Sequence, residues 1–277
     1  MKRAAQAVES LPSLPVAVLR VVRMANKPDP NITEIAAAAQ ADQGLSSRML
    51  RTANSAFYGL PRQISTIYEA SALLGTSTVR NLAMFAAACT WFTTAKPSIR
   101  GWMNELLLSS IANAICSQLI AEKAMKRMSD DAFCAGLLQN IGAAAMILWR
   151  ESKYEVVLKA ADLRRSPVYR VEQELFSFDH CLLGGMIGEQ WNLPPQMLEV
   201  VRCHHNPDAA EVNPTLTRIV YISDHLCRVA RLSPSWDRHL DPSVDVSTLG
   251  LDEPACENII ARLHELYEQS KSFAMAA

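Results

Sequence analysis

The spacing of apolar residues follows the period of an α-helix along nearly the whole chain. Between residues 15 and 24, the apolar side chains of Val18, Leu19 and Val22 fall on one side of a helix, which predicts a buried face. The sequence lacks both alternating runs of β-branched residues and Asn-Gly or Asp-Gly hairpin turns, the patterns typical of strands. The pattern therefore predicts an all-α fold.

Capping residues and breaks divide this pattern into individual helices. Asn31, with Glu34 three residues later, predicts one helix start, and Asp42 predicts the next. A short helix is expected from Ser65 to Leu74, where Gly75 ends it before a longer helix begins. Further helices are expected over residues 78–93, 98–126, 130–149, 152–164, 167–176, 180–191, 195–205, 215–231 and 253–270.

The segment Lys96-Pro97-Ser98 separates a block of short helices from a block of longer ones. We therefore expect an N-terminal helical block at residues 1–95, a helical core at 96–210 and a C-terminal helical extension at 211–277.

Composition narrows the class of protein. Of the 277 residues, 49% are hydrophobic and 20% are charged, which is typical of a globular chain. The net charge of −1 disfavours nucleic acid as a partner. Apolar runs are shorter than a membrane span and no secretion signal is evident, so we expect a cytoplasmic location and no membrane contact. The seven cysteines form no CxxC pair and are interpreted as reduced thiols that pack like small hydrophobic residues.

A series of irregular motifs carries a resemblance to a known family. The motifs, in order, are LPSLP at 11–15, LRTANSAFYGLP at 50–61, ALLG at 72–75, VRNL at 79–82, GLL at 136–138, IG at 141–142, DH at 179–180, WNLP at 191–194 and CHHNP at 203–207. In order and spacing they resemble the HDOD family, a regulatory branch of the HD superfamily, over about residues 8–210. The resemblance implies a block of short helices packed on an HD-like helical core, and a role in bacterial signal transduction.

The resemblance also shows where an active HD phosphohydrolase would hold its metal. Such an enzyme uses a His, an adjacent His-Asp pair and a later Asp, because imidazoles and carboxylates bind the metal that activates water. The first position falls on Ser109 or Ser110, and the pair falls on Gln139-Asn140. Uncharged oxygens bind transition metals poorly, so we expect no metal, no other cofactor and no catalytic residue: a pseudo-enzyme.

Four residues remain at positions similar to those of later ligands in the superfamily. They are His180, His204, His205 and Asp224. Three imidazoles and one carboxylate would hold one zinc or iron ion if they converged. The alternative function is therefore a divergent metal-dependent phosphohydrolase that uses these four residues.

A simpler interpretation of these residues is favoured. A His pair at a helix end can cap the last carbonyls, and His180 after Asp179 is expected at a helix start. Asp224 is expected to form a salt bridge to Arg218 or Arg228, both at helical spacing.

The first block supplies a candidate surface for a protein partner, since arginine and aromatic residues are favoured at interface centres. Its residues are Arg48, Arg51, Asn54, Phe57, Tyr58 and Arg62. The alternative interpretation is that the arginines form a solvated face and that the aromatic residues pack between two helices. A nucleic-acid regulator acting through these arginines and Arg80 is a third, disfavoured hypothesis.

The sequence thus favours a non-catalytic regulatory module that binds a protein partner. A nucleotide ligand in the residual pocket stays an open alternative, and the oligomeric state is not predicted.

Overall fold

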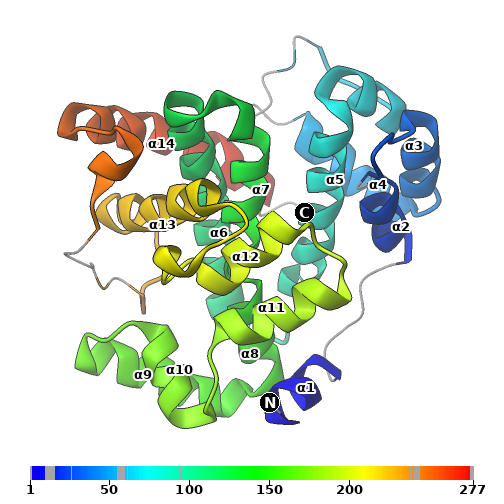
Figure 1. Ribbon diagram of the computed structural model, residues 1–277. Helices are drawn as coiled ribbons and strands as arrows, with labels where there is room; N and C mark the ends of the chain where they lie inside the picture. Colours follow the sequence, from blue (N-terminus) through cyan, green and yellow to red (C-terminus); the bar gives the residue numbers. More distant parts are fainter. Residues whose placement is uncertain are drawn as a thin grey trace.

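A computed structural model describes residues 2–9, 16–25, 27–54, 60, 62–93, 95–237, 239 and 244–274. These residues form helices and connecting loops and contain no strand, which confirms the all-α prediction (Figure 1). The α-helices are α1 Lys2–Glu9, α2 Val16–Ala25, α3 Ile32–Gln40, α4 Gln43–Ala53, α5 Ile67–Thr93, α6 Arg100–Ala124, α7 Ser129–Leu138, α8 Ile141–Trp149, α9 Glu151–Arg164, α10 Val168–Phe176, α11 His180–Gln190, α12 Pro195–Cys203, α13 Pro214–Val229 and α14 Glu253–Ala274.

Helices α6 and α7 form a central pair. Helix α6 packs against α7, α13 and α14, while α8 packs against α11 and α11 against α12. Helices α2 to α5 gather on one side of the molecule, the upper right of Figure 1. Helix α1 contacts α8 and α11, so it lies against the core at a distance from α2.

The predicted helix starts in the first block are confirmed. The side chain of Asn31 accepts hydrogen bonds from the backbone N–H groups of Thr33 and Glu34, and that of Asp42 accepts one from Leu45. These acceptors satisfy backbone N–H groups that have no partner within their own helix. Helix α5 is broken as expected at Gly75, whose φ of 83° is readily adopted only by glycine.

Polar contacts join the first block to the core. Arg80 of α5 is buried and pairs with Asp131 of α7 at 3.0 Å, and the Asn81 side chain donates to the backbone carbonyl of Asp130 at 2.9 Å. Arg80 therefore holds two helices together. The hypothesis of a basic surface that includes Arg80 is wrong for this residue.

The single helix expected over residues 130–149 is in fact two helices. Helix α7 ends at Leu138, and α8 begins at Ile141 after a turn at Gln139-Asn140. The break changes the direction of the chain, so that α8 can pack closely on α11 through Gly142. The sequence pattern missed it because both helices are apolar on nearly every side.

One segment, Lys126–Trp149, is long and apolar enough by composition to cross a membrane. The prediction from uninterrupted apolar runs overlooked it. Its most apolar stretch is 78% buried inside the fold, and the turn at residues 139–140 interrupts it. These are properties of core helices.

Candidate functional site

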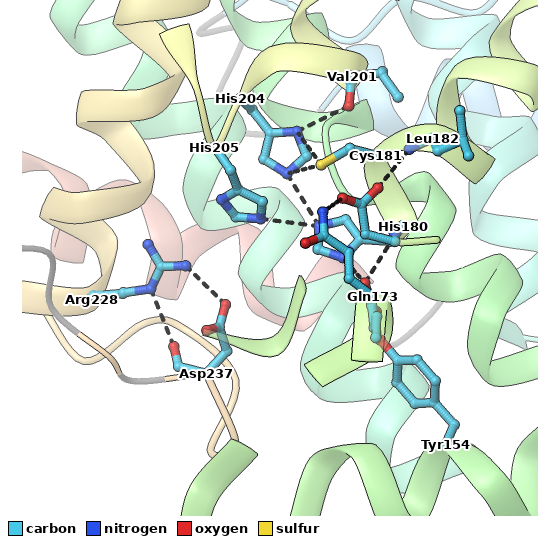
Figure 2. A network of polar contacts seen from close by, with 12 residues as sticks. Tyr154, Gln173, His180, Cys181, Leu182, Val201, His204, His205, Arg228 and Asp237 are labelled. Carbon is cyan, nitrogen blue, oxygen red and sulfur yellow. Dashed lines mark hydrogen bonds and ion pairs between the residues drawn. The ribbon is translucent and has the colours of Figure 1, made fainter. Parts of the chain in front are cut away.

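Three histidine side chains converge where α11 begins and α12 ends. His180 is the first residue of α11, after its N-cap Asp179, and His204 is the C-cap of α12. The Nε2 atom of His180 lies 3.3 Å from Nε2 of His204 and 3.1 Å from Nε2 of His205 (Figure 2). The expected positions at a helix start and a helix end are confirmed. The same positions bring the three imidazoles into one cluster.

Cys181 is the fourth member of this cluster. Its buried Sγ atom lies 3.9 Å from each ring nitrogen of His204. The four donor atoms, one from each residue, all lie within 4.8 Å of one another. The sequence pattern predicted only a small hydrophobic residue at this position, although its place directly after His180 was a signal for a ligand.

A buried carboxylate fixes the orientation of His180. One oxygen of Glu172 accepts from the Nδ1 atom of His180 at 2.7 Å and from its backbone N–H at 2.8 Å. The other oxygen accepts from the hydroxyl of Tyr154 at 2.6 Å. Glu172 and Tyr154 are fully buried, on α10 and α9, and neither was predicted as a site residue from the sequence.

The other two imidazoles are also held in place. The Nδ1 atom of His204 lies 3.1 Å from the carbonyl oxygen of Val201, which is the capping contact expected for a His at a helix end. The ring of Tyr169 stacks on His205, with centroids 4.5 Å apart and an angle of 22° between the planes. All three rings thus have defined orientations.

Burial and neighbouring charges set the protonation of the cluster. Burial and the nearby His180 lower the pKa of His204 to about 3. Burial, with His204, also lowers the pKa of His205 well below its usual value. Burial opposes charge on His180 too, but the Glu172 carboxylate raises its pKa well above the ordinary range. Burial raises the pKa of the Cys181 thiol. Among the three imidazoles, His180 is therefore the one whose pKa is raised.

Asp224, the predicted carboxylate ligand, is engaged elsewhere. Its oxygens accept hydrogen bonds from Arg228, one turn later on α13, and from the Gln139 amide at 3.5 Å. Arg228 also pairs with Asp237 at 2.8 Å. The expected salt bridge to Arg228 is confirmed, whereas Arg218 pairs instead with Asp208. The donor set that converges contains Cys181 in place of Asp224.

Neutral residues occupy the positions where an HD phosphohydrolase has its metal ligands. Their hydrogen bonds are made within the protein fold. The hydroxyls of Ser109 and Ser110 are buried and both donate to the Leu106 carbonyl at 2.9 Å. Gln139 is fully buried, and its Oε1 atom has no hydrogen-bond partner among the described residues. Asn140 sits in the turn between α7 and α8. These residues offer neither an imidazole nor a carboxylate, so they do not fit the metal of an HD phosphohydrolase.

Two adjoining cavities open beside the cluster. One has a volume of about 120 Å³ and the other about 380 Å³. Both are lined by Tyr169, Arg170, His205 and Tyr221. The smaller cavity also reaches Asp224. This is the residual pocket that the sequence analysis left open for a ligand.

The candidate partner surface is only partly preserved as an exposed face. Arg51 and Arg62 are exposed, and Arg62 pairs with Glu69 at 3.1 Å. The Asn54 side chain instead exchanges two hydrogen bonds of 2.8 Å with the backbone of Ile64, so it fastens the connection between α4 and α5. Arg48 is half-buried. Phe57 and Tyr58 lie outside the described residues.

The family follows from a comparison with known domain models. The model of the HDOD domain matches residues 11–207, which is most of the chain. This protein therefore belongs to the HDOD domain family, as the motifs predicted.

Solved structures agree with this assignment. An HDOD domain protein of unknown function from Geobacter sulfurreducens is 25% identical, with a TM-score of 0.78 over 99% of this chain and 97% of that one. A proposed phosphohydrolase from Shewanella amazonensis is 21% identical, with a TM-score of 0.74 over 98% and 97%. A proposed signal transduction protein from Marinobacter aquaeolei is 19% identical, with a TM-score of 0.70 over 99% and 64%. The last two likenesses establish the fold.

A curated relative from Treponema pallidum, an uncharacterized protein, is 23% identical over 211 residues. The alignment covers 75% of this chain and 40% of that relative, so the chain spans well under half of the relative's length.

Proposed function

We propose that this chain is a non-catalytic signal-transduction module that acts by binding a protein partner. The observation that carries the proposal is the pair of neutral amides, Gln139-Asn140, at the turn where an HD phosphohydrolase has its His-Asp pair. Gln139 donates to Asp224, which is also bound by Arg228. Asp224 thus links Gln139 to Arg228, and this arrangement supports the proposal.

The proposal also has support from chemistry. Hydrolysis of a phosphoester by this fold needs a cation that polarises the phosphate and lowers the pKa of bound water. Neither Ser109 nor the amide pair supplies a charged ligand for it. The description of the Marinobacter aquaeolei protein as a proposed signal transduction protein agrees with a regulatory role.

The proposed partner surface is the exposed part of the first block around Arg51 and Arg62. Tyr68 adds a described aromatic side chain, which is 54% exposed and adjacent in sequence to Glu69, the ion-pair partner of Arg62. Arginine and tyrosine are among the residues enriched at the energetic centres of interfaces.

Capture of partners from a lysate of the source organism tests this surface. A double charge reversal, Arg51→Glu with Arg62→Glu, is expected to remove a captured protein that the wild type retains. Arg164→Glu is the control, because Arg164 is also exposed and ion-paired, and α9 lies on the opposite side of the molecule from α4 and α5 (Figure 1). Retention by the double variant equal to the control would contradict the proposed surface.

A second candidate function, a divergent metal-dependent phosphohydrolase, is favoured by the convergence of His180, His204 and His205. It requires Asp224 to leave Arg228 and join the three imidazoles. Turnover of phosphodiesters that depends on added manganese, iron or nickel, and on His205, would support it over the binding module.

A further inference from the structure

The hydrogen atoms of two imidazoles are fixed by partners that only accept. The Glu172 oxygen that lies 2.7 Å from the Nδ1 atom of His180 also accepts from the His180 backbone N–H, so we assign the hydrogen of this pair to Nδ1. The Val201 carbonyl also only accepts, so the His204 Nδ1 atom carries its hydrogen as well. Each neutral ring then presents the lone pair of its Nε2 atom. These two Nε2 atoms lie 3.3 Å apart.

Two lone pairs at this distance repel each other unless a cation lies between them. A proton on the Nε2 atom of His180 makes one linear hydrogen bond, either to His204 or to His205, which lie 3.3 and 3.1 Å away. A hydrogen on the Nε2 atom of His205 gives the Nε2 atom of His180 a donor, but it gives none to the Nε2 atom of His204. The donor then left for the Nε2 atom of His204 is the Cys181 thiol, whose Sγ atom lies 3.9 Å away, a long contact for a buried polar atom.

We propose that His180, Cys181, His204 and His205 bind one zinc ion in a closed, four-coordinate site. Nitrogen ligands at a zinc–nitrogen distance of about 2.0–2.1 Å are about 3.3–3.4 Å apart in a tetrahedron. The distances of 3.3 and 3.1 Å from His180 match this spacing before any adjustment. The thiol of Cys181 completes the set, since all four donor atoms lie within 4.8 Å.

The ligand types select the metal. Three imidazoles and a thiolate are soft and borderline ligands that suit zinc, whereas magnesium and calcium require oxygen ligands. The contacts behind the ligands are also those of a zinc site. The Glu172 carboxylate accepts a hydrogen bond from His180, and the Val201 carbonyl accepts one from His204. Zinc-binding imidazoles are oriented by outer partners of this kind. His205 lines both neighbouring cavities and so provides a route of entry.

Four protein ligands leave no coordination place for a water molecule. Zinc sites of this kind are structural, whereas catalytic zinc sites keep one position open. The ion would tie the first turn of α11 to the end of α12, where the chain turns toward α13. The inference goes beyond the proposed binding function and is independent of it.

Metal titration of the full chain tests the site. Zinc competition against a chromophoric chelator is expected to give one tight site per chain. Cobalt in place of zinc is expected to show strong tetrahedral d–d bands and a near-ultraviolet thiolate-to-cobalt band. Cobalt spectra of the unaltered chain that lack the thiolate band, or binding far below one ion per chain, would overturn the proposal.

Variants locate the site. Cys181→Ser is expected to abolish the thiolate band and weaken zinc binding by at least about tenfold, while Glu172→Gln weakens it by about 10–100-fold. Cys203→Ser is the matched control, because this half-buried thiol adjoins His204 in sequence but is outside the four-residue cluster. Circular dichroism verifies folding of each variant. Equal zinc affinity in Cys181→Ser and Cys203→Ser would overturn the assignment.

Failure of the zinc site and failure of the proposed binding function give different experimental results. Zinc binding without hydrolysis agrees with both proposals. Hydrolysis by the zinc-loaded chain contradicts the binding module and the closed coordination of the ion, but not zinc binding by these four residues. Absence of zinc binding contradicts only the zinc site.

Discussion

A Cβ atom placed on Gly142 of α8 would lie 1.9 Å from the backbone carbonyl oxygen of His180 on α11. The two helices therefore touch backbone to backbone directly beneath the histidine cluster. A Cβ atom on Gly184 of α11 would in turn lie 2.7 Å from Val201 on α12. The glycines thus set the distance at which His180 and His204 meet.

Gly142→Ala is expected to destabilise the fold strongly, because the added methyl group meets rigid backbone. We expect a loss of about 3 kcal/mol or more in the free energy of unfolding, measured by urea denaturation. Gly101→Ala is the control: Gly101 is exposed in α6, with no atom within 4 Å of the added Cβ. Alanine there is expected to be neutral or to stabilise by up to about 1 kcal/mol. Equal effects of the two substitutions would contradict the close contact.

Tyr154→Phe removes a buried hydroxyl that donates to Glu172 at 2.6 Å. The carboxylate then lacks one of its donors, and we expect a loss of about 1–3 kcal/mol in the free energy of unfolding. Tyr68→Phe, at a residue that is 54% exposed, is the matched control and is expected to have little effect. A neutral result for Tyr154→Phe would mean that its hydroxyl does not support the Glu172–His180 pair.

Arg228→Met is expected to cost about 3–5 kcal/mol, because it leaves the buried Asp224 and the partly buried Asp237 without their cation. Arg262→Met removes an exposed pair with Glu265 and is expected to change stability by less than about 0.5 kcal/mol. Adding Asp224→Asn to Arg228→Met is expected to recover part of the loss. A double variant less stable than the single one would argue against the charge imbalance.

A pH-dependent contact is expected where Glu199 of α12 holds the loop before α13. Its carboxylate accepts backbone hydrogen bonds of 2.6 Å from Glu211, Val212 and Asn213. Burial acts to raise the pKa of Glu199, but the three donors outweigh it and lower the pKa below its usual 4.5. The contact is therefore fully present above pH 4.5 and is lost as the pH falls through the lowered pKa.

Amide proton shifts of residues 211–213 measure this directly. In the wild type they are expected to titrate together with a midpoint below 4.5, and in Glu199→Gln this transition is expected to be missing. A midpoint above 4.5 in the wild type would contradict the arrangement.

The local features of this fold were predictable from sequence, because short-range chemistry determines them. The caps at Asn31 and Asp42 and the break at Gly75 depend on residues within one turn. The break at Gln139-Asn140 was not predictable in this way, since its reason lies across the molecule, in the contact between Gly142 and α11.

The candidate site, like the fold, was predictable from sequence only in part. The motifs identified His180, His204 and His205, but not Cys181, whose meaning depends on how α11 packs on α12. Glu172 was equally hidden, because a single buried carboxylate on an amphipathic helix has no sequence signature. Asp224 was identified by its position along the chain, yet its partners are Arg228 and Gln139.

The central claim is that this HDOD chain binds rather than hydrolyses, and a phosphodiesterase and phosphatase assay tests it most directly. The purified chain is assayed with added manganese, iron, nickel or zinc, beside His205→Gln as the reference for contaminating activity. We predict that the wild type and His205→Gln give the same background rate with every metal. Metal-dependent turnover by the wild type that is absent from His205→Gln would contradict the claim.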